Sequence, residues 1–109
     1  MLTTKLPESI AAYVDGANAR DADAVAACFN EDAVVRDEGR ERQGIAVIRE
    51  WAEDVSRKYS PTVDVIAFTQ ANGRTIVTAR VSGNFPGSPI ELRYFFALHD
   101  KKIARLDIS

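Results

Sequence analysis

Asp37 is the first residue in this sequence whose position suggests chemistry. It follows Val34 and Val35, which an alternating strand would direct towards a core, and it begins a run rich in charged side chains. A carboxylate held at the mouth of an apolar pocket has a raised pKa and can act as a general base. The alternative is an ordinary solvated carboxylate, because the charges that follow favour a solvated loop at residues 38–42.

Tyr13 is the second candidate, because a phenol hydroxyl can donate a hydrogen bond to a developing negative charge. It lies on the apolar side of a predicted helix. It is therefore either a core tyrosine whose hydroxyl finds a partner, or a donor that points into a cavity. Trp51 leaves a similar choice open between a core anchor and a pocket wall.

Cys28 and His99 are weaker candidates. Cys28 lies on an apolar helix face without a base or cation pattern beside it, so we interpret it as a small buried hydrophobic residue. We interpret His99 as a surface histidine at a strand end. One cysteine and one histidine cannot build a zinc site or an internal disulfide. Carboxylate binding of a metal stays open, but no pattern indicates a metal or an organic cofactor.

The composition indicates one globular domain over residues 1–109. The chain is 46% hydrophobic and 28% charged, with a formal net charge of −2. Its basic residues are scattered, which argues against nucleic-acid binding. We find no signal-peptide pattern and no apolar run of membrane-spanning length. We therefore expect a soluble cytoplasmic protein that does not bind membranes.

The N-terminal part of the sequence predicts two helices. Apolar residues recur at helical spacing from Leu6 to Ala17, which predicts a helix with Thr3 or Thr4 as its N-cap and an end two or three residues after Ala17. Asp21 predicts the N-cap of a second, shorter helix.

A short strand and a third helix follow. Residues 30–32 interrupt the helical pattern, and residues 33–35 predict the strand. Gly44 precedes the third helix, which Ser60 and Pro61 end because proline disfavours a helical residue before it. Its apolar stripe consists of Ile45, Ile48, Ala52, Val55 and Tyr59.

From residue 62 the apolar period changes to two, which predicts strands. Asn72-Gly73 is a hairpin-turn signal, and residues 85–89 predict a longer connection. The predicted strands are residues 63–69, 75–83, 90–98 and 102–108. Helices followed by an antiparallel meander predict an α+β fold, in which three helices pack on one face of a curved, mainly antiparallel sheet and enclose a cavity.

The strand at residues 90–98 has two different faces. The apolar face, expected to meet the helices, carries Ile90, Leu92, Tyr94, Phe96 and Leu98. The mixed face carries Glu91, Arg93, Phe95, Ala97 and His99. Because the mixed face is either solvated or a subunit contact, we expect a homodimer through this face of the sheet.

Three ordered segments resemble the SnoaL-like families of the nuclear-transport-factor-2-like superfamily. They are Tyr13-Val14-x-x-x-Asn18-x-x-Asp21, then Phe29-Asn30-Glu31-Asp32-Ala33-Val34-Val35-x-Asp37, then Gly44-x-x-x-Ile48-Arg49-Glu50-Trp51. The similarity covers residues 10–51 closely and the later strands by pattern. It implies a cone-shaped, cystatin-like α+β roll.

Within that superfamily, the functional comparison is with bacterial ketosteroid isomerase. The resemblance places Tyr13 at its oxyanion-hole tyrosine and Asp37 at its proton-shuttling aspartate. Tyr94 lies about where the isomerase has a second donor, a protonated aspartic acid, while Ala52 replaces a supporting tyrosine. The sequence also offers little after Ile108 to close a pocket.

The resemblance thus implies a cofactor-free acid–base enzyme of isomerase or cyclase type, acting on an apolar carbonyl compound. Asp37, Tyr13 and Tyr94 would be its catalytic residues. We expect the ligand pocket to be lined by Val14, Phe29, Val35, Trp51, Leu92 and Phe96. A non-catalytic ligand-binding protein and a dimerisation module with a filled core are the alternatives on the same fold.

Overall fold

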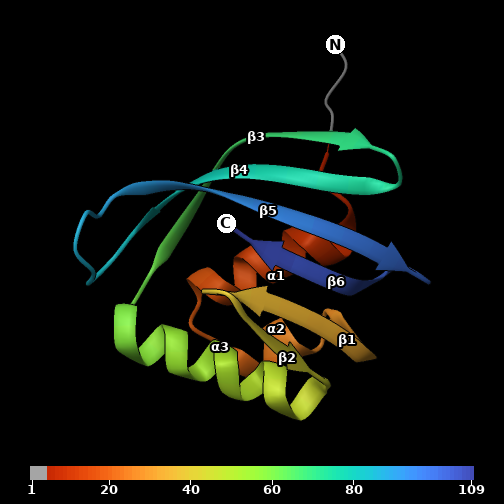
Figure 1. The fold of residues 1–109 in the computed structure, drawn as a ribbon, viewed down its shortest axis with the longest axis horizontal. Helices are drawn as coiled ribbons and strands as arrows, with labels where there is room; N and C mark the ends of the chain where they lie inside the picture. The colour runs from red at the N-terminus through yellow and green to blue at the C-terminus, as the bar shows by residue number, and fades with distance from the viewer. Residues whose placement is uncertain (1–4) are drawn as a thin grey trace.

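Residues 5–109 form three helices that cover one face of a six-stranded sheet in the computed structural model (Figure 1). The helices are α1 (Glu8–Asn18), α2 (Ala22–Ala26) and α3 (Ile45–Tyr59). The strands are β1 (Phe29–Asp37), β2 (Arg40–Gln43), β3 (Thr62–Ala71), β4 (Arg74–Ser82), β5 (Ile90–His99) and β6 (Lys102–Ile108). The predicted α+β class is confirmed.

The helix ends follow local sequence signals. Pro7 precedes α1 without a side-chain cap, and the predicted caps Thr3 and Thr4 lie outside the described residues. Asp21 caps α2 as predicted, because its Oδ1 accepts a hydrogen bond from the N–H of Ala24 at 3.1 Å. Pro61 follows the end of α3, as predicted. Across residues 5–109, none of the helices combines the length and the apolar character that a membrane crossing needs.

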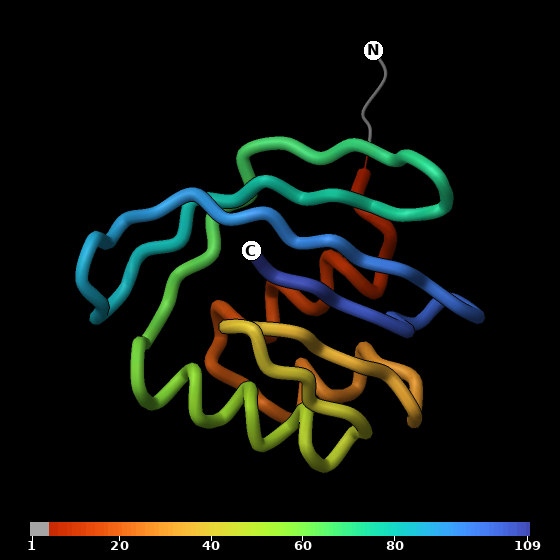
Figure 2. Tube along the Cα trace, in the orientation of Figure 1, coloured from red at the N-terminus to blue at the C-terminus, as the bar shows by residue number. Residues whose placement is uncertain are grey.

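The strand order in the sheet is β2-β1-β6-β5-β4-β3. Every neighbouring pair is antiparallel except β1 and β6, which are parallel. The chain trace in Figure 2 shows the connection between β4 and β5 extending to one side of the sheet, near the segment that leaves α3. A hydrogen bond from the N–H of Asn84 to the carbonyl oxygen of Tyr59, at 2.7 Å, joins this connection to α3.

The sequence prediction was wrong around β1 and β2. Strand β1 is longer than residues 33–35 and begins at Phe29. Its polar residues 30–32 fall where the pairing of β1 with β6 shifts register, between Phe29 and Val34. Residues 38–42 are not a loop. Glu38 and Gly39, with φ of 56° and 74°, form a two-residue turn that leads into β2. The exposed side chains of β2 gave no apolar alternation that could indicate a strand.

The core lies between the helices and the inner face of the sheet. Strand β5 has the two faces that its alternation predicts: Tyr94 and Phe96 are buried, whereas Glu91 and Arg93 are exposed. The largest fully buried side chains come from helices and strands alike: Phe29, Phe96, Ile10, Ile48, Ile103, Leu106, Val35 and Val77. This burial fixes the helices over the sheet and so fixes the walls of any space between them.

Two contacts anchor the helices to the far strands. The side-chain amide of Asn18 donates to the carbonyl oxygen of Val63 at 2.9 Å and accepts from its N–H at 2.7 Å. Gly83 lies so close to the end of α3 that a Cβ there would be 2.5 Å from the carbonyl oxygen of Tyr59. Both contacts lie beside the space described next.

Candidate functional site

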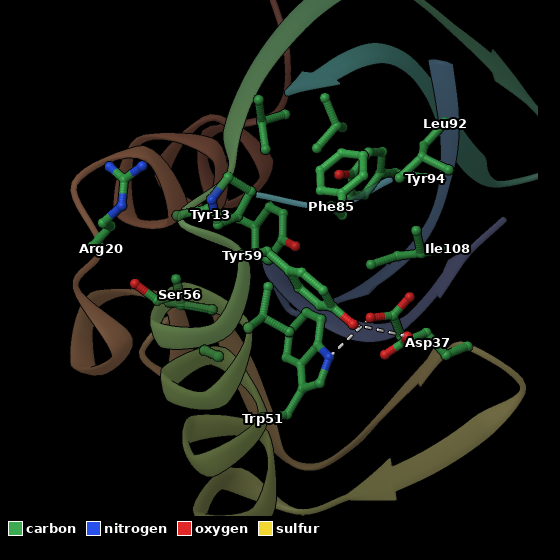
Figure 3. Close-up of a pocket in the computed structure, with 18 of the residues that line it drawn as sticks. Tyr13, Arg20, Asp37, Trp51, Ser56, Tyr59, Phe85, Leu92, Tyr94 and Ile108 are labelled. Carbon is green, nitrogen blue, oxygen red and sulfur yellow. Dashed lines mark hydrogen bonds between the residues drawn. The ribbon is translucent and has the colours of Figure 1, made fainter. Parts of the chain in front are cut away.

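A cavity of about 590 Å³ lies between the helix layer and the sheet. Its wall is mostly apolar and includes all three tyrosines and the one tryptophan of the chain. Figure 3 shows these four side chains and Asp37 arranged around one space, supplied by α1, α3, β1 and β5. A cavity of this size fits a small organic molecule of several rings.

Asp37 faces this cavity because of the alternation of β1. Ala33 and Val35 are fully buried, and Asp37, two residues further on, points to the same side. Its Oδ2 accepts a hydrogen bond from Nε1 of Trp51 at 3.1 Å. Arg42 donates to the main-chain oxygen of Asp37 at 2.8 Å and not to its carboxylate. Of the two alternatives that the sequence left open, a solvated carboxylate or one at a pocket, the structure shows a half-buried carboxylate at the cavity wall.

Burial of Asp37 raises its pKa above the ordinary value for aspartate. The indole N–H of Trp51 opposes this rise by stabilising the charged carboxylate. The neighbouring carboxylate of Glu38 adds to the rise, while the guanidinium of Arg42 and the N–H of Glu38 lower it. The net effect is a carboxylate that is more basic than a solvated one and better suited to remove a proton.

Tyr13 and Tyr94 bring two phenol hydroxyls to the same cavity. The two side chains are 4% and 5% exposed, and their ring centroids are 6.3 Å apart. Within residues 5–109, no protein group is hydrogen-bonded to either hydroxyl, although neither oxygen is sealed from the cavity. Burial raises the pKa of both phenols, and the negative charge of Asp37 contributes to both rises. Both groups therefore stay protonated and can donate to a ligand.

The predicted pocket residues divide into two groups. Trp51 and Leu92 line the cavity, as expected. The prediction was wrong for the others, because Phe29, Val35 and Phe96 are packed in the core, and Val14 packs against that core without lining the cavity. Phe29 and Phe96 support the site indirectly, since both rings pack edge-on against Tyr13, at centroid distances of 6.1 and 5.6 Å.

The cavity residues that the sequence prediction missed include Glu38, Tyr59 and Phe85. The hydroxyl of Tyr59 donates to Oε2 of Glu38 at 3.4 Å, and its ring meets Phe85 edge-on at 6.0 Å. Tyr59 was recognisable as a member of the apolar stripe of α3, but the other two carried no signal. The expected lack of closure near the end of β6 is also wrong, because Ile108 and Ser109 contribute to the wall.

Cys28 and His99 lie away from this cavity. Cys28 is buried, and its thiol donates to the carbonyl oxygen of Ala24 at 3.3 Å. His99 is exposed beside Asp100. Within residues 5–109, no three histidine, cysteine or carboxylate side chains are grouped to hold a metal ion.

Comparison with known proteins identifies the family. Residues 10–106 match the SnoaL-like domain. The chain belongs to this family. A solved candidate polyketide cyclase from Sinorhizobium meliloti is 38% identical to this SnoaL-like protein, with 95% of each chain covered and a TM-score of 0.91. No curated protein matches the chain.

More distant solved structures share the fold. A candidate polyketide cyclase from Pseudomonas putida is 24% identical, with 98% of this chain and 92% of that chain covered and a TM-score of 0.80. A hypothetical protein from Catenulispora acidiphila, with a ketosteroid isomerase-like fold and in complex with trimethylamine, is 16% identical. The alignment covers 96% of this chain and 86% of that chain, with a TM-score of 0.84. The resemblance to the ketosteroid isomerase-like fold is thereby confirmed.

Proposed function

We propose that this SnoaL-like protein is a cofactor-free acid–base enzyme, of isomerase or cyclase type, that acts on a small apolar carbonyl compound. One observation carries the proposal. The half-buried carboxylate of Asp37 faces the same apolar cavity as the hydroxyls of Tyr13 and Tyr94, which have no protein partner within residues 5–109. A base and two neutral donors around one cavity are what proton removal beside a carbonyl requires.

In the proposed reaction, Asp37 removes a proton from the carbon next to the ligand carbonyl. The C–H electron pair moves into the new C=C bond, and the carbonyl oxygen becomes an enolate oxygen. Tyr13 and Tyr94 donate hydrogen bonds to that oxygen, and their raised pKa values keep them protonated. Because the cavity wall is largely apolar, bulk water competes little with these bonds.

Two outcomes can follow from the enolate. In an isomerase, protonated Asp37 returns the proton to a different carbon of the ligand. In a cyclase, the enolate carbon attacks a second carbonyl of the same ligand, and Asp37 gives its proton to the new alkoxide. Both outcomes restore the carboxylate. The candidate polyketide cyclase from Sinorhizobium meliloti, at 38% identity, supports the second outcome.

The first step can be tested without the natural substrate. In D₂O, an enzyme of this type should exchange the α-hydrogens of 2-decalone, an apolar bicyclic ketone, for deuterium, which NMR detects. We expect Asp37→Asn to slow exchange by about 10²- to 10⁴-fold. Asp32→Asn is the matched control, because it makes the same change at an exposed carboxylate of β1 that does not line the cavity. Full exchange by Asp37→Asn would exclude Asp37 as the base.

Ligand binding without catalysis is the second candidate. The size and apolar lining of the cavity support it equally, because the two phenol hydroxyls would hold a ketone whether or not a proton moves. Binding of 2-decalone with no exchange above that of free solution would favour this candidate over the first.

A further inference from the structure

Trp51 has a position that packing alone does not require. It lies on the buried side of α3, between Ile48 and Val55, and is 7% exposed. Its ring lines the cavity, but its N–H is directed at the carboxylate of Asp37, at 3.1 Å (Figure 3). A leucine or phenylalanine would also present an apolar side chain to the cavity, but without making this bond.

The chemistry of indole makes the bond selective for one form of Asp37. Indole nitrogen is a donor with no acceptor capacity, so it stabilises a carboxylate oxygen that carries charge. Within residues 5–109, Trp51 is the one side chain that donates to this carboxylate, since Arg42 bonds to the main chain. Oδ2 therefore has a side-chain donor and Oδ1 has none, and the other donor to this carboxylate is the main-chain N–H of Glu38.

We propose that Trp51 is a positioning residue of this site: its N–H holds Oδ2 of Asp37 and leaves Oδ1 as the oxygen presented to the ligand. The use of Oδ1 as a base rests on the proposed function above. The hydrogen bond and its effect on the carboxylate do not, and they can be measured in the protein without any ligand.

Four titratable groups interact electrostatically with Asp37. They are Tyr13 on α1, Glu38 in the β1–β2 turn, Arg42 on β2 and Tyr94 on β5. Burial and the carboxylate of Glu38 raise the pKa of Asp37, whereas Trp51, Arg42 and the main-chain N–H of Glu38 lower it, and the two phenols are neutral. Removing the indole N–H alone therefore removes one of the effects that lower the pKa of Asp37 and leaves those that raise it.

Trp51→Phe tests the proposal because it keeps an aromatic ring on α3 and deletes the N–H. We expect the titration midpoint of the Asp37 carboxyl, followed by NMR of ¹³C-labelled aspartate, to move upward. The matched control is Tyr59→Phe, which deletes a hydroxyl on the same helix that bonds to Glu38 and not to Asp37. An unchanged midpoint in Trp51→Phe, or an equal rise in both variants, would overturn the proposal.

The exchange reaction gives a second readout. In Trp51→Phe, the pH profile of 2-decalone exchange should shift to higher pH together with the titration midpoint of Asp37. We expect kcat to fall by about tenfold while KM changes little, because the carboxylate is still present but is no longer held in position. A purely structural tryptophan would change stability without moving the pH profile.

A measurement on the unaltered protein covers the case in which Trp51→Phe does not fold. The chain has one tryptophan, so its indole N–H gives one side-chain NMR signal. We expect this signal to titrate with the Asp37 midpoint and to lose that titration in Asp37→Asn. An indole N–H signal that does not change over the pH range in which Asp37 titrates would overturn the positioning role. Full exchange activity in Asp37→Asn, together with a titrating indole, would instead reject the proposed function and leave the positioning role intact.

Discussion

Asp37 destabilises the folded protein at neutral pH, because its charge is partly removed from water. Its pKa is raised above the value in the unfolded chain, so the folded state binds this proton more tightly. The stability that protonated Asp37 contributes is fully present below the unfolded pKa and is lost as pH rises through the folded pKa. This is the opposite of a salt-bridged aspartate.

Asp37→Asn should therefore raise the melting temperature at pH 7, and the gain should shrink as pH falls towards about 4 and below. Asparagine keeps an oxygen that can accept from Trp51. Thermal unfolding at a series of pH values measures the effect, with Asp32→Asn as a control that removes an exposed charge from the same strand. A gain that grows towards low pH would contradict the raised pKa.

Removal of the Tyr13 hydroxyl should affect the exchange reaction much more than the stability of the fold. Because this hydroxyl has no protein partner within residues 5–109, Tyr13→Phe should change the free energy of unfolding by no more than about 0.5 kcal/mol. Loss of an oxyanion donor should slow 2-decalone exchange by about 10²- to 10³-fold. Urea unfolding and exchange rates check the two expectations. A loss above about 1 kcal/mol would indicate a structural hydroxyl.

Residue types and periodicity singled out Tyr13 and Asp37 as candidates for the site. Tyr13 follows from the helical stripe, and Asp37 from its place two residues after a buried valine. The contact between Trp51 and Asp37 could not be predicted, because a spacing of 14 residues does not determine how α3 lies against the end of β1. The same is true of Tyr59, whose hydroxyl reaches the turn at Glu38.

At the scale of elements, the end of α3 and the β4–β5 connection approach closely because Gly83 has no side chain. Gly83→Ala would place a Cβ 2.5 Å from the carbonyl oxygen of Tyr59, so one of the two backbones must move. We expect a loss of about 1–3 kcal/mol in the free energy of unfolding, measured in urea. Asn84→Ala is the control, because it keeps the N–H that bonds to Tyr59 and alters an exposed side chain. An equal loss in both variants would contradict this explanation.

Strands with apolar alternation were predicted well, and β6 was placed at residues 102–108 as observed. Strand β2 was missed because its side chains are mainly exposed on both sides, so its sequence resembles a loop. The turn before it, Glu38-Gly39, lacks the asparagine or aspartate that usually indicates a two-residue hairpin.

At the scale of the whole molecule, homodimerisation remains a prediction. The outer face of the sheet carries apolar side chains, with Ile76 paired to Phe95 across β4 and β5, and Ile66 is 55% exposed. We expect sedimentation of the wild type as a dimer and of Phe95→Glu as a monomer. Asn84→Asp adds the same charge in the β4–β5 connection and should stay dimeric. A monomeric wild type would contradict the prediction.

The order of strands has a consequence for how this protein forms. Strand β6, the last strand along the chain, lies between β1 and β5, so it alone joins the β2–β1 hairpin to the meander of β3, β4 and β5. During synthesis the two parts of the sheet cannot unite until residues 102–108 have left the ribosome. Until then the edges of β1 and β5 that pair with β6 have no partner strand. Because such distant pairing is slow, nascent chains should depend on chaperones up to that moment.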